Sequence, residues 1–518
     1  MSATSRSVQE ALADARSKGV IFWLGDGRLH YSAPKGVLSP EEISTLSGYR
    51  AEIIATLQRT ALDAAAQEAR LVPRRDMHRA PMTFSQLWYW DAFQLGKRPS
   101  LRGTSHASRL AGRLEVDALQ RSFQAIINRH ESLRTRIVTV DGVPEQRVDP
   151  QGRSELAIES LESVCDGERE ILAKEAIERE VTESIDIAAD SLFSGRLLRL
   201  REDEHVLILA MDHMISDAFS IEILLRDFFT AYSQAVAGEP FSFPIIDVQY
   251  ADYATWQRKE QDTWSERDGS YWKERLLNCN RWRFPVDIAA RDAGCCGVVT
   301  IPIYIGKELT YELRELCRRQ ATTVAMAVLT AYAALLLRWC NSSETLIQYQ
   351  TNGRASSKVQ NTMGYFASLL CLHVRLAVND DFTRLLSQVT GECSEAYEHG
   401  DNSYMATQVL RPEFARNSIF NWIPHEPRIA ASKLDNSEQP ITAQPIQFLN
   451  PALRTLEWDS DPEILLFDGG ASIAGHLYFP RNRFSVPLME RFARNILNFL
   501  QVMVKEPERH ISKIALAS

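Results

Sequence analysis

The sequence has no long uninterrupted apolar run: nowhere do about 18 consecutive apolar residues occur, the length that a membrane-spanning helix needs. Residues 1–19 also lack the apolar core and the small-residue cleavage site of a secretory signal peptide. Cysteine is sparse as well. The eight cysteines form no Cys-x-x-Cys pair, so the pattern favours neither a zinc site nor the disulfide framework of a secreted protein. We therefore expect a cytoplasmic protein without a metal centre or a membrane anchor.

An excess of positive charge is also missing. The formal net charge is −9, so no overall field draws the chain to nucleic acid or to an anionic membrane. What is present is typical of a globular protein: 45% of the 518 residues are hydrophobic and 24% are charged. At about 150 residues per domain, this length corresponds to about three folding units.

Residues 1–60 are predicted to form a small unit of their own, with a helix, a β-hairpin and a second helix in that order. The first helix is expected to begin after a cap at Ser7, and two short β-like runs flank a Gly-Asp-Gly turn at residues 25–27. Ser39 and Glu42 have the spacing of a capping box for the second helix. Residues 61–80 lack a clear apolar face in their second half, and we interpret them as a connecting segment.

From about residue 81, amphipathic helical stretches alternate with apolar strand-like runs, which is an α/β layered pattern. The clearest helical stretches are residues 116–130 and 221–236, and the clearest strands are residues 206–211 and 346–351. Residues 425–445 are polar and contain proline, so we expect a flexible loop there.

The most informative ten residues are 211–220, MDHMISDAFS. The apolar run before them predicts a strand buried on both faces, and Ser220 is expected to cap the helix that follows. His213 then lies where a strand meets a turn, and an imidazole placed there can take a proton from a nucleophile at neutral pH. Asp217 is positioned to stabilise the turn through an ion pair with an arginine. Spacing alone does not exclude the alternative that His213 is a buried histidine of the core and Asp217 an ordinary turn residue.

Six segments, in order, resemble motifs of the condensation domains of nonribosomal peptide synthetases. The segment around His213 resembles their HHxxxDG active-site motif. The other matches are PMTFSQLW at 81–88, RHESLRT at 129–135, YADYATW at 250–256, GR at 353–354 with MGYF at 363–366, and RNSIF at 416–420. Together these segments span about residues 81–510.

This resemblance implies an α/β fold with two chloramphenicol-acetyltransferase-like lobes in a V-shaped pseudo-dimer, at residues 81–260 and 261–518. In a tunnel between the lobes, an acyl thioester on the phosphopantetheine arm of a carrier protein would meet a nucleophile at the catalytic His213. The enzyme itself would bind no cofactor. The resemblance further implies that Asp217 is structural, that its partner is Arg354, and that the chain is a monomer.

Two positions in the motif loop depart from the family pattern. Asp212 stands where the family has its first histidine, and Ala218 stands where it has a glycine, so we expect a different backbone angle and more negative local charge around Ser216. The catalytic second histidine is intact, which predicts an active enzyme. Three further residues are expected near the tunnel because of their positions relative to the family motifs: Phe366, Ser368 and Asn421. For Phe366, a packed interior aromatic is the alternative.

The N-terminal unit has a resemblance of its own. Residues 28–36, RLHYSAPKG, are similar to a segment of TubC-like β-hairpin docking domains. This implies an upstream acyl or peptidyl carrier protein whose acidic C-terminal tail binds the hairpin. An exposed hairpin edge offers unpaired backbone groups for strand addition, and Arg28 and Lys35 offer cationic partners. The alternative is that these two residues belong to a solvated basic face.

These resemblances predict a stand-alone condensation enzyme that moves an acyl or polyketide chain from a carrier-protein thioester to a free small-molecule alcohol. The product is an ester and the chain is released, as with chain-releasing condensation domains of polyketide synthases. An alcohol needs a base more than an amine does, so ester formation should depend more strongly on His213 than amide formation. Two alternatives stay open: an amide-forming condensation with an amine or aminoacyl-carrier acceptor, and a non-catalytic docking adaptor between synthase subunits.

Overall fold

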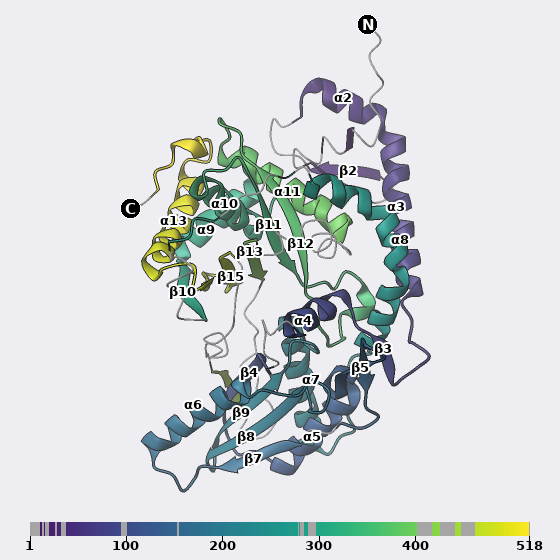
Figure 1. Ribbon diagram of the computed structural model, residues 1–518, viewed down its shortest axis with the longest axis vertical. Coiled ribbons are helices and arrows are strands. Elements are labelled where there is room, and N and C mark those ends of the chain that lie inside the picture. Colours follow the sequence, from purple (N-terminus) through teal and green to yellow (C-terminus); the bar gives the residue numbers. More distant parts are fainter. Residues whose placement is uncertain are drawn as a thin grey trace.

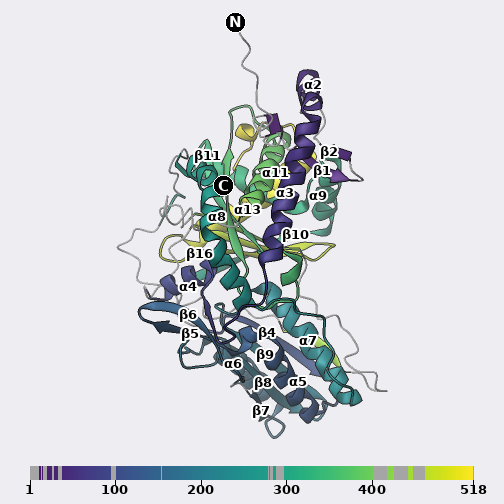
Figure 2. The ribbon, with the colours of Figure 1, turned by 90° about the vertical axis from the view of Figure 1, so that its right-hand side faces the viewer.

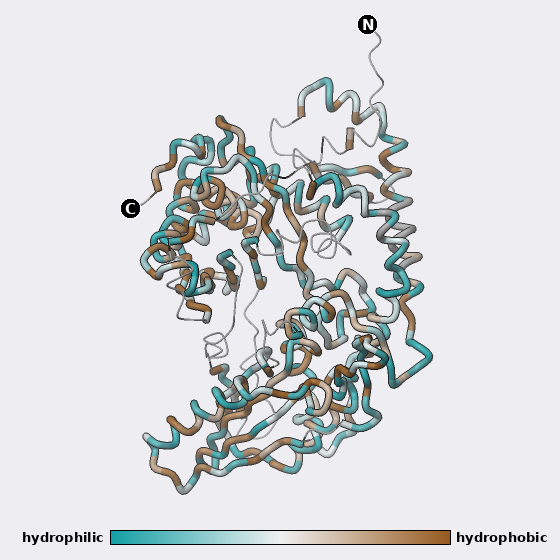
Figure 3. The backbone as a smooth tube through the Cα atoms, in the orientation of Figure 1, coloured by the Kyte–Doolittle hydropathy of each residue, from teal (hydrophilic) through white to brown (hydrophobic). Residues whose placement is uncertain are grey.

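The computed structural model describes residues 11–12, 15, 20–25, 28–32, 38–94, 101–152, 155–277, 279, 284–287, 297–400, 417–424, 441–446 and 461–516. Within these residues the chain forms a small N-terminal unit and two larger lobes. The long helices α3 (Arg50–Arg70) and α8 (Tyr250–Leu277) run side by side along one flank of the molecule (Figure 1 and Figure 2). Hydrophobic stretches occur in both lobes, so each lobe has a core of its own (Figure 3).

The N-terminal unit contains the predicted hairpin. Strands β1 (Ile21–Gly25) and β2 (Arg28–Ser32) pair antiparallel, and α3 packs against both. Helix α2 (Pro40–Gly48) begins with the predicted capping box of Ser39 and Glu42. Ser7, expected to cap the first helix, lies outside the described residues. Because α3 continues to Arg70, the boundary that we expected at residue 60 falls inside a helix, and half of the expected connecting segment is helical.

The first lobe is built on two sheets. A five-stranded sheet has the order β14-β4-β9-β8-β7, and a three-stranded sheet has the order β3-β6-β5. The strands are β3 (Arg79–Pro81), β4 (Thr104–Ala111), β5 (Thr135–Val140), β6 (Val143–Val148), β7 (Leu156–Ser160), β8 (Phe193–Arg201), β9 (Glu204–Met211) and β14 (Thr442–Pro445). The helices are α4 (Phe84–Gln94), α5 (Val116–Arg129), η1 (Glu131–Arg134), α6 (Asp166–Thr182) and α7 (Ala218–Ala237).

Strand β14 corrects the expectation of a loop through residue 445. Thr442 to Pro445 pair antiparallel with Ala111 to Ser108 of β4, so a segment from the C-terminal half forms the edge of the first lobe's sheet. Ile441 and Ala443 are buried in that lobe's core. The polar composition of 425–445 concealed this strand because its partner lies more than 300 positions earlier in the sequence.

The second lobe is built on a six-stranded sheet of order β10-β16-β15-β13-β11-β12. Its strands are β10 (Val298–Ile305), β11 (Glu344–Thr351), β12 (Ser368–Arg375), β13 (Ile419–Ile423), β15 (Glu463–Asp468) and β16 (Ile473–Pro480). Its helices are α9 (Lys307–Arg319), α10 (Val324–Trp339), η2 (Ser357–Val359), α11 (Phe382–Glu398), α13 (Val486–Lys505) and η6 (Ile511–Lys513). The boundary expected at residues 260 and 261 falls inside α8.

The burial of individual elements follows the sequence pattern. Every residue of the apolar run 206–211 in β9 is buried, as expected for a strand covered on both faces. Helix α10 is apolar on all sides, and residues 325–337 are buried throughout. Among the described residues, no single helix has both the length and the composition to cross a membrane; the bent pair α9 and α10 passes those two criteria only when taken together.

Candidate active site

His213 lies in the short loop between β9 and α7, as the sequence predicts. Its imidazole is partly exposed, whereas the residues on either side of it in the loop are buried. Its Nδ1 atom lies 2.8 Å from the backbone oxygen of Ser216. A carbonyl oxygen can only accept, so Nδ1 carries the proton and donates it to Ser216. In the neutral ring, Nε2 is then the basic nitrogen, which is the tautomer that a general base needs.

Asp212 stabilises this loop from within. Its carboxylate accepts a hydrogen bond from the backbone N–H of Met214 at 2.7 Å, and its backbone oxygen accepts one from the Ser216 hydroxyl at 2.9 Å. Asp212 is fully buried. A short carboxylate that bonds to the backbone two residues on is a common way to stabilise a turn. Asp212 therefore stabilises the loop through hydrogen bonds within the loop itself.

The N-cap of α7 is Asp217, which corrects the expectation that Ser220 would cap this helix. The Asp217 carboxylate accepts from the Ser220 backbone N–H at 2.8 Å, and Ser220 occupies the third helical position of a capping box. Ala218 is the first residue of α7 and does not have a positive φ. A glycine is therefore not needed here for its backbone freedom.

Asp217 and Arg354 form a buried salt bridge between the two halves of the chain. Arg354 Nη1 lies 2.7 Å from Asp217 Oδ2, and Nη2 lies 3.2 Å from Oδ1. The backbone N–H groups of Phe366 and Ala367 also donate to Oδ2, at 3.1 and 3.2 Å. The Arg354 side chain is 0% exposed, and its guanidinium lies between the rings of Phe219 and Phe366. Both carboxylate oxygens of Asp217 are thus bonded to the protein itself.

Glycine is required at two positions near this salt bridge. Gly353 has a φ of 62°, and a Cβ there would lie 1.8 Å from the backbone oxygen of Phe366. A Cβ at Gly364 would lie 2.1 Å from the ring of Tyr250. The GR and MGYF segments therefore pack so closely against each other and against α8 that no side chain fits between them.

Gln86 holds the histidine loop from outside, which the sequence does not reveal. Its Nε2 atom donates to the backbone oxygen of Met214 at 2.8 Å, and its Oε1 accepts from the Thr83 backbone N–H at 3.0 Å. The side chain is fully buried. In the sequence, the segment 81–88 stands out only by its resemblance, because nothing in its own pattern indicates a bond to a residue 128 positions later.

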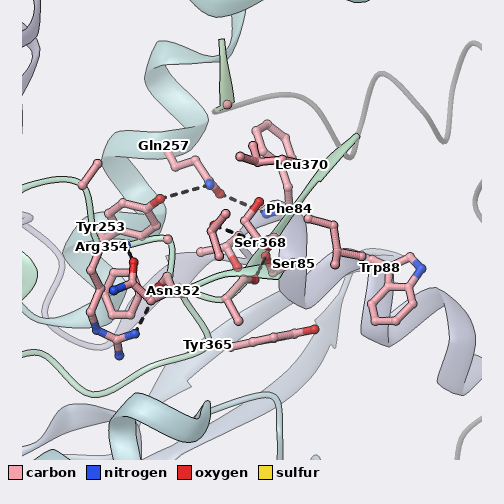
Figure 4. Close-up of a pocket in the computed structure, with 18 of the residues that line it drawn as sticks. Phe84, Ser85, Trp88, Tyr253, Gln257, Asn352, Arg354, Tyr365, Ser368 and Leu370 are labelled. Atoms are coloured by element: carbon pink, nitrogen blue, oxygen red, sulfur yellow. Dashed lines mark hydrogen bonds between the residues drawn. The ribbon is translucent and has the colours of Figure 1, made fainter. Parts of the chain in front are cut away.

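Two cavities lie on either side of a short wall made by Thr351, Asn352 and Ala367, which line both. The larger cavity has a volume of about 230 Å³, and the smaller one about 110 Å³. The larger pocket receives Phe84, Ser85 and Trp88 from α4 and Tyr253 and Gln257 from α8 (Figure 4).

The three residues predicted near a tunnel, Phe366, Ser368 and Asn421, are divided between these two pockets, as are three residues predicted to support or form the motif loop. Arg354, Phe366 and Ser368 line the larger one, whereas Asp217, Ala218 and Asn421 line the smaller one. Phe366 is only 3% exposed and packs on Tyr250 and Tyr253, so it is an interior aromatic as well as part of the wall. His213 lines neither pocket, but its ring lies 4.4 Å from that of Tyr365, which lines the larger one.

The other motif residues form structural ion pairs. The buried Arg74 lies between Glu131 of the RHESLRT segment, at 2.8 Å, and Asp252 of the YADYATW segment, at 2.7 Å. His130 and Arg129 both bond to the buried Asp227 of α7. Burial lowers the pKa of His130, which favours the neutral ring in this contact.

One group of potential metal ligands occurs among the described residues: Cys279, Glu344 and His373 have ligand atoms within 4.8 Å of one another. Arg375 Nη2 lies 3.3 Å from His373 Nδ1, and His373 Nε2 lies 2.7 Å from Glu344. Because arginine can only donate, Nδ1 accepts and Nε2–H points to the carboxylate. Burial lowers the pKa of His373. The contacts of the histidine are those of a buried hydrogen-bonded pair, and we assign no metal to it.

The docking hairpin presents an apolar and basic surface. Trp23 and Tyr31 are 46% and 53% exposed, and Trp23 stacks on His30. Arg28 is exposed at the start of β2. Lys35, the second predicted docking residue, lies outside the described residues.

Residues 77–518 match the family model of the condensation domain. The chain belongs to the condensation-domain family. Residues 8–59, which precede the condensation domain, match the model of the TubC N-terminal docking domain. The predicted α/β fold with two chloramphenicol-acetyltransferase-like lobes behind a docking unit is thereby confirmed.

The condensation domain is similar to parts of much longer synthetases. It is 30% identical over 323 residues to the enniatin synthase of Fusarium equiseti, which is 61% of this chain and 10% of that protein. It is 25% identical over 442 residues to the beauvericin nonribosomal cyclodepsipeptide synthetase of Beauveria bassiana, which is 83% of this chain and 13% of that protein. The matched region is therefore a small fraction of either relative's length.

Among solved structures, the condensation domain for chain release from the enacyloxin polyketide synthase superposes with a TM-score of 0.67. The match covers 99% of this chain and 97% of that one, at 17% sequence identity. At this identity the similarity shows a shared fold.

Proposed function

We propose that this condensation domain transfers an acyl chain from the phosphopantetheine thioester of a separate carrier protein to the hydroxyl of a free small molecule. An ester forms and the chain is released. Membership of the family supports acyl transfer. The match to a chain-releasing domain along almost the whole chain supports release of the chain. The relative named as a cyclodepsipeptide synthetase supports an ester over an amide.

The observation that carries the proposal is the hydrogen bond from His213 Nδ1 to the Ser216 oxygen. With its proton fixed at Nδ1, the imidazole offers Nε2 to the hydroxyl of the acceptor and removes its proton as the oxygen attacks the thioester carbon. The proton then passes to the departing thiol of the arm. Orientation of the two substrates by the protein supplies a further large part of the rate.

Asp217 and Arg354 take a supporting role in this proposal. Their carboxylate and guanidinium satisfy each other in a buried place, so neither is available to exchange a proton with a substrate. Their salt bridge fixes the start of α7, and with it the loop that carries His213. Asp212 and Ser216 contribute the hydrogen bonds that keep the loop closed.

The two pockets give each substrate a route of its own. The larger pocket and the smaller pocket meet at the wall of Thr351, Asn352 and Ala367, and residues of the His213 loop or its ring neighbours line both. We propose that the arm of the carrier protein occupies one pocket and the acceptor the other. Phe366, Ser368 and Asn421 would then contact substrate near the wall.

The proposed partner of the N-terminal unit is the acidic C-terminal tail of an upstream carrier protein. The exposed hairpin offers backbone groups for strand addition, and its exposed aromatic residues and Arg28 suit a segment that mixes apolar and acidic side chains. Lys35 adds a second cation in the same stretch of sequence.

Transfer from a carrier-bound model acyl thioester to a panel of free alcohols and amines tests the proposal, with products followed by mass spectrometry. We expect an ester with at least one alcohol, and loss of that product in His213→Ala. His78→Ala, at an exposed histidine of the same lobe, is the matched control and should keep the activity. An amide as the main product would support the amine-acceptor alternative. Carrier binding without any transfer would support the adaptor.

A further inference from the structure

Tyr365 stands between His213 and the larger pocket. The centroids of the two rings are 4.4 Å apart, with their planes tilted by 49°. Tyr365 lines the pocket, whereas His213 does not. Figure 4 shows the tyrosine ring along one side of the cavity, with its hydroxyl directed toward the side of Trp88. A molecule in this pocket therefore meets the tyrosine ring before it meets the imidazole.

The backbone on both sides of Tyr365 is fixed to the first lobe. The backbone oxygen of Tyr365 accepts from the Tyr250 hydroxyl at 2.6 Å. The N–H of Gly364 donates to the Ser220 hydroxyl at 3.1 Å, and the N–H of Phe366 donates to Asp217 at 3.1 Å. Three successive residues are thus held by α7 and α8, so the position of the Tyr365 ring is set by the same elements that set the His213 loop.

A third ring completes the group. Tyr89 of α4 meets Tyr365 edge-on, with centroids 6.4 Å apart and planes at 87°, and lies 6.0 Å from the His213 ring. Tyr89 and Tyr365 are only 6% and 8% exposed. Edge-to-face contacts of this kind favour one arrangement of the rings. The imidazole is therefore packed against two tyrosine rings.

We infer that the ring of Tyr365 is a positioning residue that holds the His213 imidazole in its reactive orientation and closes the path between the larger pocket and His213 to water. The inference rests on the proposed function, in which His213 removes a proton from the acceptor. The contacts that carry it are contacts of the ring, so a phenylalanine, which keeps the ring, should keep this role.

Loss of the ring has a chemical consequence that can be measured. Water that reaches the thioester carbon competes with the acceptor hydroxyl. In that reaction the carbon–sulfur bond breaks, the acyl carbon takes the water oxygen, and the thiol of the arm takes up a proton. The product is then a free carboxylic acid instead of an ester. The share of free acid among the products therefore reports how well the path is closed.

The test compares Tyr365→Phe with Tyr365→Leu, using a carrier-bound model acyl thioester and the alcohol identified above. We expect Tyr365→Phe to keep kcat within about 3-fold. We expect Tyr365→Leu to lower kcat by at least about 10-fold, with a smaller change in KM, and to raise the share of free acid. Tyr311→Leu is the control, because Tyr311 is an exposed tyrosine of α9 and lines neither pocket. It should leave the product ratio unchanged.

Circular dichroism and thermal melting show whether each variant is folded. An unchanged kcat and product ratio in a folded Tyr365→Leu would overturn the inference. So would a Tyr365→Phe variant that loses as much activity as Tyr365→Leu, since the hydroxyl would then be the important group. The His213→Ala variant distinguishes a failure of the proposed function from a failure of the role given to Tyr365. If His213→Ala stays active, the proposed function fails, whereas an inactive His213→Ala beside a fully active Tyr365→Leu refutes only the role of Tyr365.

Discussion

The side-chain amide of Gln86 donates to the backbone oxygen of Met214, one residue after His213, at a distance of 2.8 Å. This contact connects α4 to the loop of the proposed base. The hydrogen bond is buried, so its loss leaves the Met214 oxygen without its buried side-chain donor.

We predict that Gln86→Leu lowers kcat while the protein stays folded. An unsatisfied buried carbonyl costs about 1–3 kcal/mol. If that cost is relieved by a shift of the loop, the rate falls by about 10- to 100-fold. Steady-state transfer kinetics and thermal melting measure the two effects. Gln124→Leu, at an exposed glutamine of α5, is the control and should change neither. A wild-type kcat in Gln86→Leu would show that the contact is dispensable.

The salt bridge between Asp217 and Arg354 should behave as a buried pair. Asp217→Ala leaves the fully buried Arg354 guanidinium uncompensated, and we expect a loss of about 3–5 kcal/mol in the free energy of unfolding. The double variant Asp217→Ala/Arg354→Met removes both charges and should recover part of that loss. Urea unfolding measures both.

A surface pair provides the comparison. Arg113 and Glu202 form an ion pair in which the side chains are 71% and 72% exposed, so Glu202→Ala should cost less than about 1 kcal/mol. If Asp217→Ala costs no more than Glu202→Ala, the first lobe does not depend on its bond to Arg354.

Acid should destabilise the fold through buried histidines. Burial lowers the pKa of His106 in β4 to about 4, from an ordinary value of 6.5. The unfolded chain therefore binds a proton at this site that the folded chain does not bind, and the free energy of unfolding falls as the pH drops from about 6.5 to about 4. One histidine contributes at most about 1.4 kcal/mol per pH unit.

Urea unfolding at pH 7, 6 and 5 measures this dependence. His106→Gln should reduce the slope between pH 6.5 and 5, whereas His78→Gln, at an exposed histidine, should leave it as it is. An identical slope in the wild type and in His106→Gln would mean that His106 does not contribute.

Glu68 at the end of α3 joins the docking unit to the site. Its carboxylate accepts hydrogen bonds from the Ser356 hydroxyl at 2.7 Å and from the Ser357 hydroxyl at 2.8 Å, and these bonds lower the pKa of Glu68. The Lys358 ammonium donates to the backbone oxygen of Glu68 at 2.7 Å. The segment so held begins two residues after Arg354.

We predict that Glu68→Ala raises amide hydrogen exchange in residues 353–362, because this segment loses its attachment to α3. Exchange measured by mass spectrometry on the full chain tests this. Glu52→Ala, at an exposed glutamate in the first turn of α3, is the control and should leave these residues unchanged. Equal protection in both variants would contradict the role given to Glu68.

Local patterns predict the local elements. The apolar run in β9 and the amphipathic stretch of α5 each determine a structure within a few neighbouring residues, and both elements are present, as is the antiparallel pairing of β1 with β2. The sequence pattern assigns the cap of α7 to Ser220 instead of Asp217 because both residue types cap helices, and only the backbone angles distinguish them.

Contacts between distant segments cannot be predicted in this way. The bond of Gln86 to Met214, the ring of Tyr365 beside His213 and the pairing of β14 with β4 join residues far apart in the sequence. The pairing of Asp217 with Arg354 is anticipated only through the family resemblance. No periodicity in a single chain contains such information.

The position of β14 means that the two lobes are not separable parts. Strands β13 and β15 belong to the second lobe, yet the strand between them in sequence completes the sheet of the first. A fragment that ended after α8 would leave the backbone groups along one side of β4 without their partner strand. Such an open edge invites pairing with other chains, so the first lobe on its own would be prone to aggregate, and synthesis must pass residue 445 before this sheet is complete.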